Sequence, residues 1–313
     1  MVRETFVGLM GQETAIELLS QAITKRQLAP AYLFAGPIGV GRRLAALRFA
    51  EQLLSTETAD ITILRRRIGM HNHPDFLWVE PTYLHQGRPV TVAEAEELGI
   101  RRRSAPQIRL LQIRGITQFL ARPTLESPRA VVVIEGAETM AEAAANGLLK
   151  TLEEPGQASL ILLAPDSAAL LPTLVSRCQH IPFRRLAPET MAAVLTQAGH
   201  ATILQQPDIL AMAQGSPGQA IAAWQQLQAL PAELLSAIQT PPQSLRQALD
   251  LARQISKELD TETQLWLVDY LQHYYWERQR SPAFLTALET ARQHLQRFVQ
   301  PRLVWEVTLM TLV

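Results

Sequence analysis

Residues 31–43, with the sequence AYLFAGPIGVGRR, place the strongest constraint on how this chain folds. The apolar start predicts a buried strand, the glycines predict a tight loop, and the Ala- and Leu-rich continuation predicts a helix. Strand, glycine loop and helix in this order form the frame of a phosphate-binding P-loop, G-x-x-x-x-G-K-[ST]. Gly36 and Gly41 occupy the two glycine positions, but Arg42 and Arg43 stand where the motif has Lys and Ser or Thr.

The two arginines decide what this loop can do chemically. In a working P-loop, backbone N–H groups hold the phosphates, a lysine reaches the β- and γ-phosphates, and a hydroxyl binds Mg²⁺. Arg42 keeps a positive charge but has a larger, planar head. Arg43 has no oxygen with which to bind a metal. We therefore expect the loop, including Gly39 between the two motif glycines, to be degenerate and unable to support hydrolysis.

The acidic residues that should complete such a site are degraded as well. A buried strand of the site should lead into an acidic pair that serves the metal and the attacking water. The β-branched run 131–134 predicts that strand, but Glu135, Gly136 and then Glu138 follow it. Gly136 stands where a second carboxylate is expected. Magnesium ligands are thus lost at two separate places, which indicates an abandoned site.

Strands and helices alternate over residues 31–166, which predicts an α/β domain with a parallel sheet. The apolar runs 76–79, 131–134 and 160–164 are typical of buried strands. The stretch from about 55 to 108 is the least regular part of this half. Within it, residues 84–106 show no sustained periodicity, so we expect an exposed insertion there.

After Phe183 no run of residues is typical of a strand, and the second half is expected to be entirely helical. Ser216-Pro217 and Ser281-Pro282 each precede an amphipathic stretch, as a helix N-cap followed by proline at the first helical position. The recurring prolines predict a small helical bundle to about residue 229 and a larger one beyond it.

Composition narrows the class of protein further. Apolar residues make up 47% of the 313 residues, and the formal net charge is zero, so no global basic field draws this chain to nucleic acid. Cys178 is the single cysteine, which excludes an internal disulfide framework and fits a reducing compartment. Neither a signal peptide nor a membrane span is evident, and the expected location is cytoplasmic.

Six motifs in a fixed order resemble one protein family. The most specific is NGLLKTLEEP at 146–155, followed about twenty residues later by S-R-C at 176–178. The other four are Gly8 to Gln12, the loop 36–43, His73-Pro74-Asp75 and Leu171-Pro172-Thr173. Together they resemble the clamp-loader branch of the AAA+ proteins, and within it the delta-prime subunits of bacterial DNA polymerase III. The motifs cover about residues 1–220, and the helical remainder matches by architecture alone.

The resemblance implies a role for Arg177, the arginine of the S-R-C motif. In that family this arginine is a finger that reaches into the ATP site of a neighbouring subunit, and Ser176 and Cys178 help to set its position. The chemistry is sound, because an arginine supplied in trans stabilises charge on the γ-phosphoryl group as it is transferred.

The resemblance also implies a domain division and a set of partners. It places an AAA+ α/β domain at 1–183, a three-helix lid at 184–229 and a helical collar domain for oligomerisation at 230–313. The chain would then be a stator that does not hydrolyse ATP, bound to the clamp-loader ATPase subunits and the clamp-opening subunit. Sliding clamp and primer–template DNA would be reached through that complex, and no membrane is involved.

Departures from the family pattern are informative too. Many relatives carry a four-cysteine zinc module after the P-loop helix, and this chain has no cysteine there, so no zinc and no other cofactor is expected. The possible substitutes are three irregularly spaced histidines: His71, His73 and His85. Pro165-Asp166 replaces a polar sensor beside the γ-phosphate, and Gln219 stands where a second sensor arginine is common. His73 is expected to be structural.

The sequence leaves some questions open. Lys150 and Glu154 are i, i+4 on a helix and pair at the surface in one interpretation; in the other, this helix packs on the S-R-C region or on the next subunit. Two alternative functions also stand beside the stator. One is an active ATPase with Arg42 in place of lysine. The other is a DNA-binding module that uses the basic triplets Arg65–Arg67 or Arg101–Arg103, and the neutral charge disfavours it.

Overall fold

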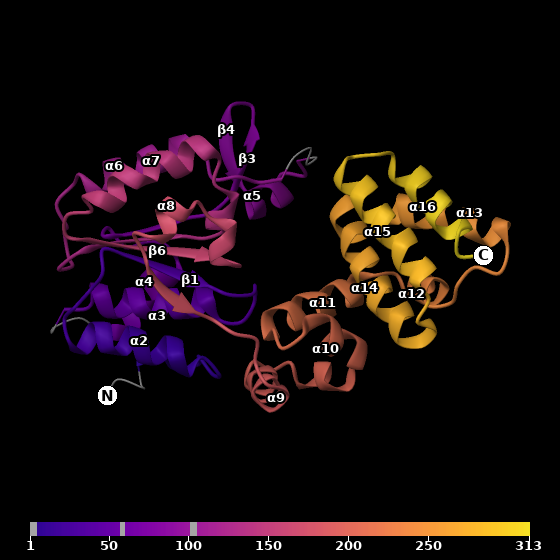
Figure 1. The fold of residues 1–313 in the computed structure, drawn as a ribbon, viewed down its shortest axis with the longest axis horizontal. Coiled ribbons are helices and arrows are strands. Elements are labelled where there is room, and N and C mark those ends of the chain that lie inside the picture. The colour runs from indigo at the N-terminus through magenta and orange to yellow at the C-terminus, as the bar shows by residue number, and fades with distance from the viewer. Residues whose placement is uncertain (1–4, 57–59, 101–104) are drawn as a thin grey trace. The chain divides into compact units, whose positions relative to one another are not determined.

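Five parallel strands form the central sheet of the first half of the chain. The computed structural model describes residues 5–56, 60–100 and 105–313, and gives the spatial order β2-β5-β6-β1-β7. The strands are β1 (Ala31–Ala35), β2 (Phe76–Val79), β5 (Ala130–Ile134), β6 (Ala158–Ala164) and β7 (Gln179–Pro182). Neighbouring strands pair in parallel throughout. The predicted α/β class with a parallel sheet is confirmed (Figure 1).

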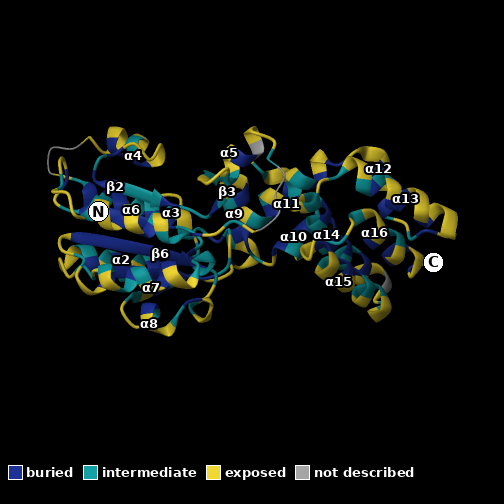
Figure 2. Ribbon diagram, turned by 90° about the horizontal axis from the view of Figure 1, so that it is seen from above, coloured by how far each residue is buried: buried dark blue, intermediate teal, exposed yellow. Residues whose placement is uncertain are grey.

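Helices cover both faces of this sheet (Figure 1). One face carries the helices α2 (Glu13–Thr24), α3 (Arg42–Leu54) and α4 (Ile61–Gly69). The other carries α6 (Leu110–Leu120), α7 (Glu142–Glu153) and α8 (Pro172–Val175). Because both faces are covered, the inner strands are almost entirely apolar, and β6 is buried along its whole length (Figure 2).

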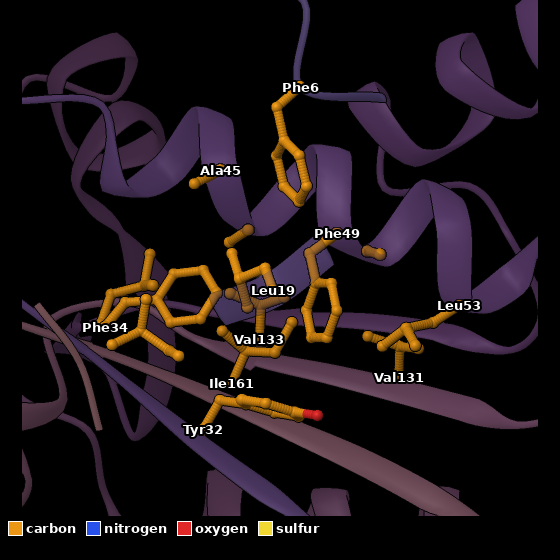
Figure 3. Packing of buried hydrophobic residues seen from close by; sticks show 14 of the residues in the cluster. Phe6, Leu19, Tyr32, Phe34, Ala45, Phe49, Leu53, Val131, Val133 and Ile161 are labelled. Carbon is orange, nitrogen blue, oxygen red and sulfur yellow. The ribbon is translucent and has the colours of Figure 1, made fainter. Parts of the chain in front are cut away.

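Side chains of the strands alternate between two apolar clusters. In β1, Tyr32 and Phe34 point into the cluster beneath α2 and α3, whereas Leu33 points into the opposite one. Figure 3 shows Phe49 of α3 lying over the sheet near Tyr32, and the two rings meet edge to face with centroids 4.9 Å apart. Such aromatic pairs stabilise the fold by about 0.5–1.5 kcal/mol beyond the contribution of the surface area that they bury. This packing fixes the strand and the helix that flank the glycine loop.

The stretch predicted as an exposed insertion contains secondary structure that the sequence did not indicate. Two antiparallel strands, β3 (Thr82–His85) and β4 (Arg88–Thr91), form a hairpin that the short helix α5 (Val92–Glu97) follows. On the opposite side of the glycine loop in sequence, α2 ends at Thr24, before Pro30. Arg101–Arg103 lie outside the described residues.

The last strand of the sheet, β7, was not predicted. Its four residues lie on the outer edge of β1, with Leu33 opposite His180 and Phe34 opposite Ile181. The strand is short and half-polar because only one neighbour pairs with it, so a buried apolar run is not required. After it, the described residues contain helices only, as predicted.

Those helices lie mainly in a second compact unit. The chain divides into residues 1–194 and 195–313, and α9 (Pro188–Gln197) crosses the boundary. The remaining helices are α10 (Pro207–Ala213), α11 (Pro217–Ala229), α12 (Ala232–Ile238), α13 (Leu245–Glu258), α14 (Thr261–Gln279), α15 (Pro282–Gln296) and α16 (Pro301–Met310). The short 3₁₀ helices of the two units are η1 (Ala137–Thr139), η2 (Ser167–Ala169) and η3 (Ala201–Gln205). The division into α/β, lid and collar domains stays a prediction.

The helices of the second unit pack around a core that contains few polar side chains. Ser216 and Ser281 are N-caps with proline at the first helical position, as predicted, although only Ser216 accepts a capping hydrogen bond, from the Gln219 N–H. Trp305 of α16 is fully buried, and its Nε1 donates to Gln264 of α14 at 2.9 Å. Within the described ranges, no helix has the length and apolar character needed to cross a membrane.

Candidate functional site

The glycine loop between β1 and α3 keeps a P-loop shape for reasons of packing. A Cβ at Gly36 would lie 2.3 Å from the carbonyl oxygen of Phe183, which follows β7. Gly41 has a φ of +106°, and its Cβ would lie 2.6 Å from the Cδ1 atom of Leu9. Gly39, between them, has a φ of +80°. Glycine is therefore required at the two motif positions whether or not a phosphate binds.

Arg42, at the lysine position of the motif, is a half-buried cation. Its Nη1 atom is buried without a hydrogen-bond partner among the described residues, and so is Oε2 of Glu138 in η1. Burial lowers the pKa of Arg42, while the negative charges of Glu138 and Glu135 raise it and offset part of that effect. The charges of Glu138 and Glu135 thus partly balance the arginine at the lysine position of the motif.

Arg43, at the hydroxyl position of the motif, forms an ion pair across the site. Its Nη1 atom donates to Oε2 of Glu135 at 2.8 Å, and its guanidinium carbon lies 4.7 Å from the centre of the Trp78 ring. The Trp78 indole N–H donates to the same carboxylate oxygen at 3.1 Å. In a working site, a hydroxyl at position 43 and a carboxylate at position 135 would both serve Mg²⁺. Here the guanidinium of Arg43 supplies the positive charge beside Glu135.

The residues at this site do not fit a magnesium ion. Mg²⁺ requires oxygen ligands in near-octahedral geometry, yet Glu135 is engaged by Arg43, and Gly136 has no side chain. No cluster of three or more His, Cys, Asp or Glu residues in the described ranges could hold a metal. The ring of His71 stacks on Trp78 with centroids 5.1 Å apart, and His85 lies in the β3–β4 hairpin.

Asp166 and Gln219 stand at the two expected sensor positions. Asp166 caps η2, because its carboxylate accepts from the Ala168 N–H at 3.1 Å and from the Ser167 hydroxyl at 3.3 Å. Gln219 lies in the first turn of α11, in the second compact unit. Neither residue brings a positive charge that would report on a phosphate.

His73 and Asp75 form a buried structural motif. The Asp75 carboxylate accepts hydrogen bonds from the backbone N–H groups of Leu125, Glu126 and Ser127, each at 2.8 Å. His73 is also buried, and its Nδ1 atom accepts from the Asp75 N–H at 3.2 Å. Burial alone would raise the pKa of Asp75, but the three N–H donors lower it below its ordinary value. Asp75 therefore anchors the loop at residues 125–127, and His73, which was predicted to be structural, contacts the backbone of Asp75.

The basic triplet 65–67 is tied into the fold. Arg65 donates through Nε and Nη2 to the carboxylate of Glu51, a side chain only 2% exposed. Arg67 forms a two-pronged pair with Glu126, at 2.6 and 3.0 Å. These two guanidinium groups neutralise carboxylates of their own domain, so they do not form a free basic surface.

Arg177, the predicted finger, lies at the end of α8 with its side chain exposed. Its Nη2 atom donates to Oε1 of Glu153 at 2.7 Å, and its Nη1 atom donates to the Thr173 carbonyl at 3.0 Å. Glu153 is the last residue of α7 and belongs to the NGLLKTLEEP motif. The motif helix therefore contacts the S-R-C segment, which favours one of the two interpretations left open for this helix.

The residues that flank Arg177 anchor its backbone. Ser176 Oγ donates to the same Thr173 carbonyl at 3.1 Å. The Cys178 N–H donates to the Val175 carbonyl at 3.1 Å, and its side chain packs against the apolar cluster beneath α7 and α8. Burial raises the pKa of the Cys178 thiol to about 11, so the thiol stays protonated and serves as packing.

Gln12 belongs to the first of the six motifs, but the sequence did not indicate its structural role. This buried side chain donates through Nε2 to the Val40 carbonyl of the glycine loop at 3.1 Å and to the Arg184 carbonyl at 2.7 Å. Its Oε1 atom accepts from the Arg184 N–H at 3.0 Å. Gln12 therefore ties the glycine loop to the segment that follows β7. A polar residue that starts an apolar helix was the signal available in the sequence.

Comparison with known proteins agrees with this architecture. The family described as "DNA polymerase III, delta subunit" matches residues 11–187, and "Cyanobacterial DNA polymerase III delta prime, C-terminal domain" matches residues 189–312. A solved DNA polymerase III gamma subunit-related protein from Thermotoga maritima shares the fold, with a TM-score of 0.53 at 17% identity. That match covers 93% of this chain and 97% of the other.

Two curated relatives have the name "DNA polymerase III subunit delta'". The protein from Bacillus subtilis is 31% identical over 185 residues, which are 58% of this chain and 50% of that protein. The protein from Pseudomonas aeruginosa is 32% identical over 210 residues, which are 64% of this chain and 57% of that protein. The chain thus spans about half the length of the curated relatives that it matches. With a family model matched over more than half of its residues, this chain belongs to the DNA polymerase III delta subunit family and resembles its delta-prime members.

Proposed function

We propose that this chain is a delta-prime-like stator of a DNA polymerase III clamp loader, which leaves ATP hydrolysis to its neighbours and presents Arg177 to one of them. The observation that carries the first part is the ion pair between Arg43 and Glu135, at 2.8 Å. An ATPase needs a metal ion at this position, and a guanidinium, which only donates hydrogen bonds, can neither bind that metal nor activate a water molecule. The chain would therefore not hydrolyse ATP itself within an assembly whose other subunits do.

The state of Arg177 supports the second part of the proposal. Its side chain is 37% exposed and lies at a helix end, so it is accessible to a second chain. A guanidinium presents a planar fork that matches phosphate oxygens, and an arginine supplied in trans contributes about 10³–10⁵-fold to γ-phosphoryl transfer in well-studied cases. The backbone contacts of Ser176 and Cys178 hold the segment in place for such a role.

The partners follow from the family. We propose that the chain binds the clamp-loader ATPase subunits and the clamp-opening subunit, through a surface that includes Arg177 and through its helical C-terminal unit. Closure of the interface on ATP would favour the assembly that opens the sliding clamp and places it on primed DNA. The chain's own contribution is positional and electrostatic, and it needs no bound cofactor.

The decisive experiment replaces Arg177 in the reconstituted complex. We expect Arg177→Ala to lower hydrolysis at the adjacent ATP site by about 10³-fold and to impair clamp loading with it. Arg114→Ala, which removes another exposed arginine from α6, serves as the matched control and should leave both unchanged. Unchanged hydrolysis and loading with Arg177→Ala would show that the finger role is wrong.

The rival ATPase function has one feature in its favour, the cation that Arg42 retains beside the loop. Calorimetry of the isolated chain with ATP and Mg²⁺ separates the two functions. Micromolar, magnesium-dependent binding with turnover would favour the rival. The DNA-binding alternative predicts salt-sensitive binding of DNA by the isolated chain, and the commitment of Arg65 and Arg67 to Glu51 and Glu126 argues against it.

A further inference from the structure

Both ends of the Arg177 guanidinium are occupied by acceptors of its own subunit. The Glu153 carboxylate takes one nitrogen at 2.7 Å, and the Thr173 carbonyl takes the other at 3.0 Å. Glu153 is the last residue of α7, so the negative end of the helix dipole adds to its charge. The group that is proposed to reach a neighbouring phosphate is thus directed toward its own domain in the isolated chain.

This self-contact is easy to break. The side chains of Arg177 and Glu153 are 37% and 52% exposed. Water screens the charges of such an ion pair, so the pair contributes little to the stability of the fold. A nucleotide γ-phosphate carries more charge than one carboxylate and accepts the same two-pronged hydrogen bonds. It can therefore displace Glu153 when a neighbouring subunit brings ATP within reach.

We propose that Glu153 is a positioning residue that holds Arg177 in a parked state until the phosphates of a neighbouring subunit displace it. This inference rests on the proposed function, because it gives the finger a resting partner. The carboxylate competes with the phosphate for one guanidinium, so it weakens capture of ATP at the interface without taking part in the transition state. It also keeps Arg177 away from other anions while the interface is open.

The test compares Glu153→Gln with Glu154→Gln in the reconstituted complex. Glu154 is the adjacent residue, is also exposed, and makes no side-chain contact with Arg177, so its substitution changes net charge equally. We expect Glu153→Gln to lower the apparent KM for ATP by about 1.5- to 5-fold, the range for loss of an exposed ion pair, with kcat unchanged. Glu154→Gln should change neither quantity. In an Arg177→Ala background, Glu153→Gln should have no further effect.

Each other outcome overturns the parked state. An unchanged KM with Glu153→Gln, while Arg177→Ala abolishes hydrolysis at the adjacent site, refutes parking and leaves the finger role intact. A fall in kcat would mean that Glu153 aligns the finger for the reaction, which also contradicts the proposal. If Arg177→Ala itself has no effect, the finger and its parking fail together.

Discussion

Asp75 is the residue whose replacement tests the physical account of the α/β domain most directly. Its buried carboxylate accepts three backbone N–H groups of residues 125–127, all at 2.8 Å. Hydrogen bonds to a charged group contribute about 1.5–3 kcal/mol each, and neutral ones about 1 kcal/mol. Asp75→Asn leaves one carbonyl oxygen for two of the donors and turns an NH₂ group toward the Leu125 N–H. We expect a loss of about 3–5 kcal/mol in the free energy of unfolding.

The assay must isolate the unit that contains Asp75. Because the chain forms two compact units, a single unfolding midpoint is ambiguous, and native-state hydrogen exchange on peptides from residues 1–194 is the better measurement. The amides of residues 125–127 should lose protection first. Asp60→Asn is the matched control, since Asp60 is an exposed N-cap of α4 and asparagine caps helices equally well. If Asp75→Asn costs no more than Asp60→Asn, the anchor account is refuted.

The pH dependence of Asp75 gives a second check on the same reasoning. The pKa of Asp75 in the folded state lies below its ordinary value, so the carboxylate stabilises the fold above the pKa of the unfolded chain. That stabilisation is lost as the pH falls through the folded-state pKa. The difference in stability between the native chain and Asp75→Asn should therefore be full at pH 7 and shrink below about pH 4. A difference that is constant with pH would contradict a charged anchor.

Two further predictions concern the glycine loop. Gly36→Ala places a Cβ 2.3 Å from the Phe183 carbonyl oxygen. We expect this change to destabilise residues 1–194 by about 1–3 kcal/mol, as measured by hydrogen exchange. Gly69→Ala is the control, because a Cβ at Gly69 would have open space around it. Arg43→Met should cost about 1 kcal/mol at low salt through loss of the partly exposed pair with Glu135 and the contact with Trp78. This loss should shrink in 1 M NaCl, where the screening length is about 3 Å; equal losses at both salt concentrations would argue against an ion pair.

The main features of the fold could be predicted because its strands are buried on both faces. The runs that became β1, β5 and β6 are nearly continuous and apolar, as expected for strands of a parallel sheet that is covered on both faces. The β3–β4 hairpin was missed because its turn, Gln86-Gly87, lacks the Asn-Gly or Asp-Gly pair usual for two-residue turns. Both turn residues have positive φ, at 49° and 80°, as a two-residue hairpin turn requires, although the sequence lacks the residue pair that best indicates such a turn.

The lack of a metal-binding oxygen at position 43 could be predicted from residue chemistry, whereas the pairing of Arg43 could not. That Arg43 cannot ligate a metal follows from its atoms. That it pairs with Glu135, ninety-two positions along the chain, depends on the order of strands in the sheet. The same holds for Glu153 and Arg177, and for Asp75 and the loop at 125–127. Long-range contacts of this kind arise from topology, and a periodic pattern does not specify them.

The ion pair between Arg43 and Glu135 has a consequence for how this domain responds to its surroundings. A metal ion exchanges with solvent, so a site built around one follows the free magnesium concentration and can be emptied by a chelator. A guanidinium attached through its own side chain has an effective local concentration that dilution does not change. The electrostatic balance at the carboxyl end of β5 is therefore set when the chain folds and does not follow the free magnesium concentration.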